Sequence, residues 1–167
     1  IAPRTTTQSN DQPKPGDKTG AVAMSAGWGI SYKKIAVASG KGGVGKTWFA
    51  ITLSHALANN NRNVLLLDGD LGLANVDIQL GLMPKHDLGS VLTGRLPLNQ
   101  AAIAFDEGGF DIIAGRSGSG NLANISVSRL NSLNEDLTML SSSYDHIIFD
   151  LGAGVERTVR NLSNQVD

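Results

Sequence analysis

Apolar residues along this chain follow two spacings, one typical of strands and one typical of helices. Short, mostly apolar runs of the kind found in strands buried on both faces of a sheet predict strands at 35–38, 64–67, 110–114 and 146–149. Apolar residues three or four positions apart predict helices at 46–60, 75–82, 87–93 and 126–142. Strands and helices therefore alternate, and this order predicts an α/β fold: a doubly wound, mainly parallel sheet with helices on both faces.

The two longer predicted helices each carry apolar residues at helical spacing. In the first helix, the residues expected to face the sheet are Phe49, Ala50, Leu53, Ala56 and Leu57. In the last helix, a leucine-rich stripe is expected to do the same through Val127, Leu130, Leu133, Leu137 and Leu140. Such stripes predict buried core rather than an interaction surface.

The first 32 residues differ from the rest of the chain. They hold three of the five prolines, together with many Ser, Thr, Gln, Asn and Gly residues. A segment with so little apolar surface cannot offset the entropy that it would lose on ordering. We therefore expect residues 1–32 to be a flexible N-terminal extension and residues 33–167 to form the folded part.

Composition narrows the class of protein. With 167 residues, 17% of them charged, and a formal net charge of −1, the chain lacks the excess of basic residues typical of a broad nucleic-acid-binding face. The absence of cysteine excludes a disulfide framework, a thiolate metal site and a cysteine nucleophile. No apolar run approaches the roughly 20 residues of a membrane span and no signal peptide is visible, so a cytoplasmic location is expected.

Residues 35–47 carry the strongest chemical signal. The spacing Gly40-x-x-x-x-Gly45-Lys46-Thr47 follows a predicted strand and opens a predicted helix, which is the context of a phosphate-binding P-loop. Glycines let the backbone turn its N–H groups toward an anion, and the helix N-terminus adds a positive dipole end. Lys46 is expected to reach the β- and γ-phosphates of a nucleotide, and Thr47 to offer its hydroxyl to Mg²⁺.

Two other interpretations of this loop are weaker. Gly40-x-Gly42-x-x-Gly45 also matches the dinucleotide fingerprint of a Rossmann dehydrogenase, with Asp68 at the end of the next predicted strand. A dinucleotide site, however, has no use for the Lys46-Thr47 pair. The same pair argues against a glycine-rich turn that binds nothing.

Three aspartates follow predicted strands. Asp68 and Asp70 come after one strand and Asp150 after another, and the carboxyl ends of parallel strands form the ligand-binding edge of such sheets. Carboxylates there are costly unless they meet a cation or water, and in a P-loop site the cation is Mg²⁺. The alternative is that the first two acids cap a helix and solvate a loop. Arg116, in the loop at 115–120, is expected either to touch phosphate or a partner subunit, or to belong to a plain connector.

Together these motifs resemble a known family. The segment Gly40-Lys41-Gly42-Gly43-Val44-Gly45-Lys46-Thr47 resembles the deviant Walker A box of the MinD/ParA family of P-loop ATPases. Residues 65–77 look like the second box of the MinD branch, and residues 72–82 look most like the flagellar-number regulators called FlhG or FleN. Residues 147–154 are similar to the Walker B and switch II stretch. The resemblance covers roughly residues 34–160 and is more specific to the family than to one branch.

The resemblance implies a role for each site residue. Nucleotide would be bound by the loop and the residue after it: Gly40, Lys41, Gly42, Gly43, Val44, Gly45, Lys46, Thr47 and Trp48. Catalysis would depend on Lys46, on Asp70, which would orient the attacking water, and on Lys41, which would reach the phosphates of a partner subunit. The Mg²⁺ site would be formed by Thr47, Asp68 and Asp150. Trp48 departs from the family, which usually has a small hydroxyl residue there that contacts the α-phosphate.

The function implied by the resemblance is a Mg²⁺-dependent ATPase whose ATP-driven homodimerisation acts as a switch in spatial regulation. Control of flagellar number or placement, or a related form of cell positioning, is favoured. A MinD-type division-site protein, a ParA-type DNA-partition protein and a nucleotide-binding scaffold with little turnover are the alternatives. The near-neutral charge disfavours nucleic acid as a partner but leaves it open.

The same resemblance bears on partners and completeness. A regulatory protein partner is expected, and peripheral contact with the inner face of the membrane, through a region not present in this sequence, is left open. The chain starts at Ile1 rather than Met and stops at Asp167 without a terminating element. We therefore expect residues 33–167 to be the N-terminal part of a P-loop ATPase domain that is truncated at its C-terminus.

Overall fold

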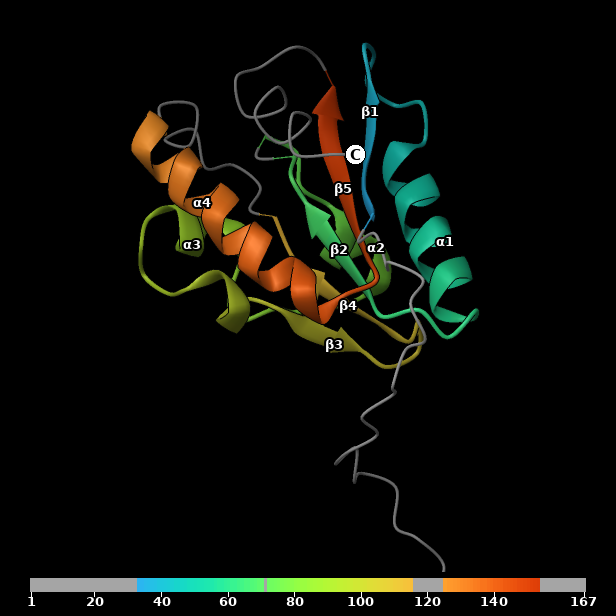
Figure 1. Ribbon diagram of the computed structural model, residues 1–167. Helices are drawn as coiled ribbons and strands as arrows, with labels where there is room; N and C mark the ends of the chain where they lie inside the picture. The colour runs from blue at the N-terminus through green and yellow to red at the C-terminus, as the bar shows by residue number, and fades with distance from the viewer. Residues whose placement is uncertain (1–32, 71, 116–124, 154–167) are drawn as a thin grey trace, which may run out of the picture.

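The computed structural model describes residues 33–70, 72–115 and 125–153, which form a five-stranded sheet with helices on both faces (Figure 1). The strands are β1 (Lys33–Ser39), β2 (Val64–Asp68), β3 (Ile103–Phe105), β4 (Phe110–Ile113) and β5 (His146–Ala153). Their order across the sheet is β1-β5-β2-β4-β3, with β3 antiparallel to β4 and the other pairs parallel. The predicted doubly wound, mainly parallel sheet is confirmed.

Every predicted helix is present, although each is somewhat shorter than expected. The helices are α1 (Lys46–Ala58), α2 (Val76–Leu80), α3 (Leu88–Leu92) and α4 (Val127–Leu140), with 3-10 turns η1 (Leu98–Gln100) and η3 (Ser141–Ser143). Side-chain caps set two of the starts: the Asp87 carboxylate accepts from Ser90 N–H at 2.6 Å, and the Ser126 hydroxyl accepts from Arg129 N–H at 3.3 Å. The edge strand β3 was not predicted, because three residues are too few to show a period.

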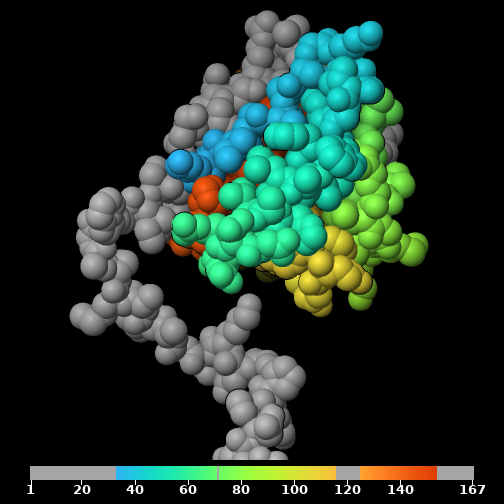
Figure 2. Space-filling view, turned by 90° about the vertical axis from the view of Figure 1, so that its right-hand side faces the viewer, coloured from blue at the N-terminus to red at the C-terminus, as the bar shows by residue number. Residues whose placement is uncertain are grey.

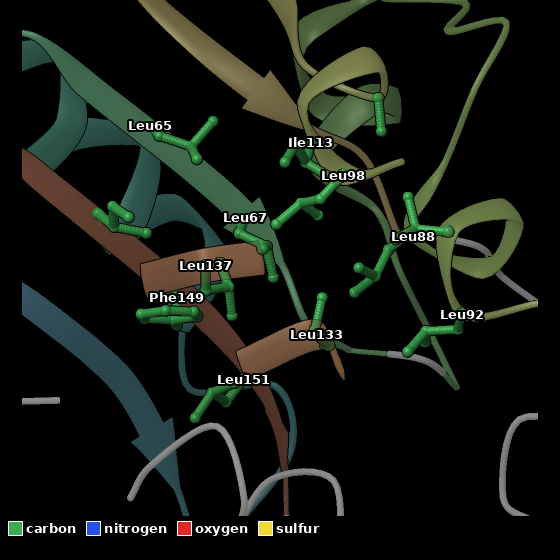
Figure 3. Close-up of a cluster of buried hydrophobic side chains, with 13 residues drawn as sticks. Leu65, Leu67, Leu88, Leu92, Leu98, Ile113, Leu133, Leu137, Phe149 and Leu151 are labelled. Carbon is green, nitrogen blue, oxygen red and sulfur yellow. The ribbon is translucent and has the colours of Figure 1, made fainter. Parts of the chain in front are cut away.

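Two apolar layers cover the sheet, and alternate residues of each central strand contribute to one or the other. In β2, Leu65 and Leu67 pack on the layer formed with α3 and α4, while Val64 and Leu66 pack on the layer beneath α1. Figure 3 shows the first layer, in which Leu133 and Leu137 of α4 lie over Phe149 and Leu151 of β5. All five side chains of β2 are buried, as expected for a strand covered on both faces.

The expected inner face of α1 is only partly correct. Ala50 is buried, and Leu53 and Leu57 pack partly against the sheet, but Phe49 is 53% exposed and Ala56 is also exposed. The apolar residues of α1 lie on all sides of the helix, so their spacing alone does not identify the side that is buried. Figure 2 looks onto α1, with the α2 region beside it in green.

The leucine stripe of α4 is largely confirmed. Leu130, Leu133 and Leu137 are buried, and Leu140 packs partly against the same layer. Val127, in the first turn of the helix, is 55% exposed and is not part of that layer. The stripe therefore forms core, as predicted, and its first member does not.

The same alternation places two of the aspartates. Asp68 and Asp150 have the parity of Leu66 and Ile148, so they lie on the α1 side of the sheet. They are register partners on β2 and β5, and β5 continues past Asp150 to Ala153 instead of ending there.

The predicted extension at 1–32 and Arg116 lie outside the described residues. Among the helices that are described, none is both long and apolar enough to cross a membrane.

Candidate functional site

The loop between β1 and α1 turns at two glycines in the left-handed region. Gly43 has φ 73° and Gly45, the N-cap of α1, has φ 89°, conformations that other residues rarely adopt. The Ser39 hydroxyl donates to the Lys41 carbonyl at 2.6 Å and fixes the start of the turn. A Cβ built on Gly40 or Gly42 would meet no described atom within 4 Å. The loop therefore presents open backbone surface that a ligand can occupy.

The first turn of α1 directs backbone donors toward the same space. The first hydrogen bond of the helix runs from Phe49 N–H to the Gly45 carbonyl at 3.0 Å. The N–H groups of Lys46, Thr47 and Trp48 precede it, and N–H groups at this position have no partner within a helix. Together with the positive end of the helix dipole, they form a site suited to an anion.

A cleft of about 500 Å³ lies at this end of α1. Its walls come from the loop, the start of α1, the segment after β2, α2 and the end of β5. The lining residues are Gly42, Gly43, Gly45, Lys46, Thr47, Trp48, Gly69, Asp70, Gly72, Leu73, Asn75, Gln79, Gly152 and Ala153. The carboxyl edge of the sheet and the loop therefore face one common space, as the spacing of the motifs predicted.

Asp150 is a buried carboxylate next to the start of α1. Its side chain is 1% exposed, and burial raises its pKa, while a hydrogen bond with the Thr47 side chain and the charge of Lys46 act in the opposite direction. Within the described part of the chain, its Oδ1 atom has no hydrogen-bond partner. Buried polar oxygens normally have one. This oxygen is thus available to a cation or a water molecule.

Asp68 is buried as well, but both of its oxygens have hydrogen-bond partners. Oδ1 accepts from Asp70 N–H at 3.1 Å, and Oδ2 accepts from the N–H groups of Asn75 and Val76 at 3.0 and 3.1 Å. Burial raises its pKa to about 7, against the lowering effect of these hydrogen bonds. Asp68 therefore anchors the segment after β2 and caps α2, which is the alternative role weighed for the acids at this strand end.

Asp68 is held from its other side by Gly115, which follows β4. A Cβ at that position would lie 2.5 Å from the Ala74 Cβ and 2.9 Å from the Asp68 Cγ. Only glycine allows this approach without displacing one of the neighbours. The anchor therefore depends on a close approach from the end of β4 as well as on the hydrogen bonds of its own loop.

Asp70 lies on the cleft wall and is oriented by its own loop. Its Oδ1 accepts from Gly72 N–H at 3.2 Å and from Leu73 N–H at 2.9 Å. A Cβ on Gly152 would lie 3.1 Å from the Asp70 Cγ, so the glycine leaves just enough room for the carboxylate. The Gly69 N–H donates to the Asp150 carbonyl at 2.8 Å, which joins this loop to β5. Asp70 is consequently held in one position beside the end of β5.

The donors present fit a magnesium ion that is shared with phosphate. No group of three or more His, Asp or Glu side chains forms a metal cage within residues 33–70, 72–115 and 125–153. Mg²⁺ at phosphate sites usually uses one or two carboxylates, with phosphate oxygens and water completing its octahedron. The unpartnered oxygen of Asp150, next to the Thr47 hydroxyl, meets that requirement.

The structure gathers most of the predicted site residues. Seven of them line the cleft: Gly42, Gly43, Gly45, Lys46, Thr47, Trp48 and Asp70. Gly40, Lys41 and Val44 lie on the exposed part of the loop, and Asp68 and Asp150 lie buried in the sheet. Leu73, Asn75 and Gln79 also line the cleft but were not assigned to the site, although they follow the acids after β2 and lie in the segments 65–77 and 72–82 that carry the family resemblance.

Comparison with known proteins gives concordant results. Residues 32–161 match a family model described as an AAA domain. The chain is 41% identical over 125 residues to the antiactivator FleN of Pseudomonas aeruginosa, covering 75% of this chain and 44% of FleN. It is 36% identical over 135 residues to the flagellum site-determining protein YlxH of Helicobacter pylori, covering 81% of this chain and 46% of YlxH. The chain thus spans about half the length of these curated relatives.

The fold is also similar to a solved structure with bound nucleotide. This is the septum site-determining protein MinD of Pyrococcus horikoshii, complexed with Mg-ADP, which is 30% identical with a TM-score of 0.71. The alignment covers 80% of this chain and 54% of that one. The likeness therefore extends over most of this chain and about half of that one.

Proposed function

Because this chain belongs to the MinD/ParA family of P-loop ATPases, we propose that it binds ATP with Mg²⁺ in the cleft and hydrolyses it to ADP and phosphate. Lys46 and the N–H groups at the start of α1 bind the phosphates. Thr47 and Asp150 hold the cation, and Asp70 orients the attacking water. Mg²⁺ supplies charge neutralisation at the phosphate oxygens. Asp68 serves this site by fixing the loop that carries Asp70.

One observation carries the proposal. A buried carboxylate with an unpartnered oxygen, Asp150, hydrogen-bonds to the Thr47 side chain at the N-terminus of α1. A buried charge without a partner is costly, so an apolar residue would stabilise the fold better than Asp150 if this position had only a structural role. A cation brought by a polyphosphate removes that cost. The MinD structure with Mg-ADP supports ATP and Mg²⁺ as the ligands.

Binding and turnover, measured together, test the proposal. Calorimetry with ATP in the presence and absence of Mg²⁺ gives the affinity, and phosphate release gives the rate. Lys46→Ala should weaken ATP binding by two orders of magnitude or more, while Lys85→Ala, which removes an exposed lysine outside the cleft, should not. Failure of the unaltered chain to bind ATP would overturn the proposal. Tight binding without Mg²⁺-dependent turnover, even with a regulatory partner, would favour a nucleotide-binding scaffold.

We further propose that ATP drives homodimerisation through Lys41. This lysine is exposed on the loop and does not line the cleft of its own chain, so its side chain is free to reach the phosphates of a second copy. Lys41→Ala should leave ATP affinity largely intact and abolish ATP-induced dimers in sedimentation experiments. Dimers that persist in this variant would show the cross-subunit role to be wrong.

The biological role that we propose is spatial regulation of flagella, in the cytoplasm or at the inner face of the membrane, together with a regulatory protein partner. The names of FleN and YlxH, an antiactivator and a flagellum site-determining protein, support it. The MinD likeness supports division-site placement as the second candidate. Deleting the gene separates the two: altered flagellar number supports the first, misplaced septa the second, and unstable DNA inheritance a ParA-type role.

A further inference from the structure

Two aromatic residues stand next to each other in the first turn of α1, and only one of them faces the cleft. Trp48 is 67% exposed and Phe49 is 53% exposed. Neither belongs to the two apolar layers of the described fold. Trp48 lines the cleft, whereas Phe49 is not part of its wall. The indole therefore has no packing role in this part of the chain, and its position in the cleft suggests a ligand contact.

A second apolar side chain lies on another wall of the same cleft. Leu73, in the segment after β2, is 77% exposed and lines the cleft together with Trp48. The rest of the lining consists mainly of glycine backbone, Lys46, Thr47 and polar residues, which suit phosphate and a cation. A leucine offers no hydrogen-bond donor and an indole offers only one, so neither side chain is well suited to bind phosphate. They do suit a flat, partly apolar group attached to the phosphates.

The position of Trp48 indicates which group that is. It directly follows Thr47, and its N–H belongs to the anion-binding first turn of α1. The backbone of Trp48 therefore lies where the phosphates are proposed to bind, and its side chain lines the cleft beside them. An indole that lines the cleft next to the phosphates is placed to contact the group that they carry, which in ATP is the nucleoside.

We propose that the Trp48 indole packs against the nucleoside of the bound nucleotide, with Leu73 as a second apolar contact. This inference rests on the proposed ATP-binding function. Trp48 is thus a specificity residue: it makes the site favour a nucleotide over a bare polyphosphate.

The test compares two ligands in the full chain. Calorimetry measures the affinity of Mg²⁺-ATP and of Mg²⁺-tripolyphosphate, which has no nucleoside, for the unaltered chain and for Trp48→Ala, Trp48→Phe and Phe49→Ala. Trp48→Ala should weaken ATP binding roughly 5- to 150-fold, the range for removing an aromatic ring that stacks on a base, and leave tripolyphosphate binding unchanged. Trp48→Phe should retain most of the ATP affinity. Phe49→Ala should change the affinity for neither ligand.

Unchanged ATP affinity in Trp48→Ala would overturn the inference, and so would an equal loss for tripolyphosphate, which would indicate a distorted loop.

A second readout needs no substitution at Trp48. The chain has two tryptophans, so in Trp28→Phe the emission comes from Trp48 alone. ATP should change this emission more than tripolyphosphate does, and equal responses would contradict the proposal. If the unaltered chain binds no ATP, the proposed function itself fails; if it binds ATP without involving Trp48, only this inference does.

Discussion

Asp68 and Asp150 face each other across two paired strands, yet their surroundings differ in one decisive respect. They are register partners on β2 and β5, and both are almost fully buried. Three backbone N–H groups satisfy Asp68, whereas Asp150 keeps one oxygen without a partner among the described residues. Burial raises the pKa of both. Equal burial and equal chemistry therefore do not imply equal roles.

The comparison shows that two aspartates at the same sheet edge can have different roles, depending on how many of their oxygens the protein itself satisfies. An aspartate whose oxygens are filled by loop N–H groups stabilises the loop and has little capacity left for a metal. An aspartate with a free oxygen beside Thr47 and Lys46 is unsatisfied in the protein alone, and a ligand can complete it. Asp68 was expected to hold Mg²⁺ together with Asp150. The observed contacts favour Asp150 for that role, and the assignment of metal ligands stays a prediction.

The largest expected effect is that of Asp150→Asn on turnover. The amide still accepts from Thr47 but carries no charge for a cation, so Mg²⁺-dependent phosphate release should fall at least about 100-fold, or roughly 3 kcal/mol of transition-state stabilisation. The free energy of unfolding without ligand should change little, because the lost oxygen had no partner within the described fold. Phosphate-release assays and urea unfolding measure the two. Normal turnover with normal Mg²⁺ dependence would refute the metal role.

Asp68→Ala should show the opposite pattern, with its main effect on stability. The substitution leaves the N–H groups of Asp70, Asn75 and Val76 without their acceptor, which should cost about 2–4 kcal/mol of unfolding free energy. Asp106→Ala, at an exposed position, provides the control and should stay within about 0.5 kcal/mol. Urea denaturation measures both. A variant as stable as the control would mean that Asp68 is no anchor.

The pH dependence of stability sharpens the comparison further. The pKa of the Asp68 carboxyl is about 7 in the folded chain and 3.8 in the unfolded chain. Between these two pH values the folded chain keeps a proton on Asp68 that the unfolded chain has lost. The folded state then binds more protons, so the free energy of unfolding should fall as pH rises through this window. Asp68→Asn lacks this proton. The stability difference, unaltered chain minus variant, should therefore drop by about 1–3 kcal/mol between pH 5 and 7.

Urea unfolding at several pH values, with EDTA and without nucleotide, gives this difference directly. Groups that do not interact with Asp68 cancel because both proteins contain them, whereas Asp150, whose charge raises the Asp68 pKa, titrates together with it and contributes to the same difference. Among the groups that cancel is His146, whose pKa is lowered by burial. A stability difference that does not vary with pH would show that the buried carboxyl is ionised in the folded chain throughout.

The smallest effect is expected from Gly152→Ala. The new Cβ would lie 3.1 Å from the Asp70 Cγ, so the carboxylate must move by a few tenths of an ångström. Turnover should fall about 5- to 10-fold, since small misplacements of a catalytic group are costly, and ATP affinity should change less. Gly72→Ala is the matched control, because its Cβ would touch the same carboxylate at an ordinary 3.6 Å. Equal rates in the two variants would argue against a positioned Asp70.

Much of this site follows from the sequence, because its signals are local. Glycine spacing, a strand before it and a helix after it predict the loop, and acids after apolar runs predict the sheet edge. These features depend on neighbours within a few residues, which is why they could be predicted.

What sequence reasoning missed depends on contacts between distant segments. Nothing near Asp68 in the chain indicates that Gly115 packs against it, or that three loop N–H groups fill its oxygens. The exposure of Phe49 likewise depends on how α1 is rotated over the sheet, which its evenly distributed apolar residues do not determine. The short edge strand β3 is defined by its pairing with β4 rather than by its own pattern.

The most direct test is a crystal structure of the chain with Mg²⁺ and a non-hydrolysable ATP analogue. We expect the phosphates to lie against the N–H groups of the loop and of α1. The ion, or one of its water ligands, should bond to the Asp150 oxygen that has no partner among the described residues. Asp68 should retain its three backbone partners and make no contact with the ion. An ion bonded to Asp68 instead, or a nucleotide bound outside this cleft, would contradict the account.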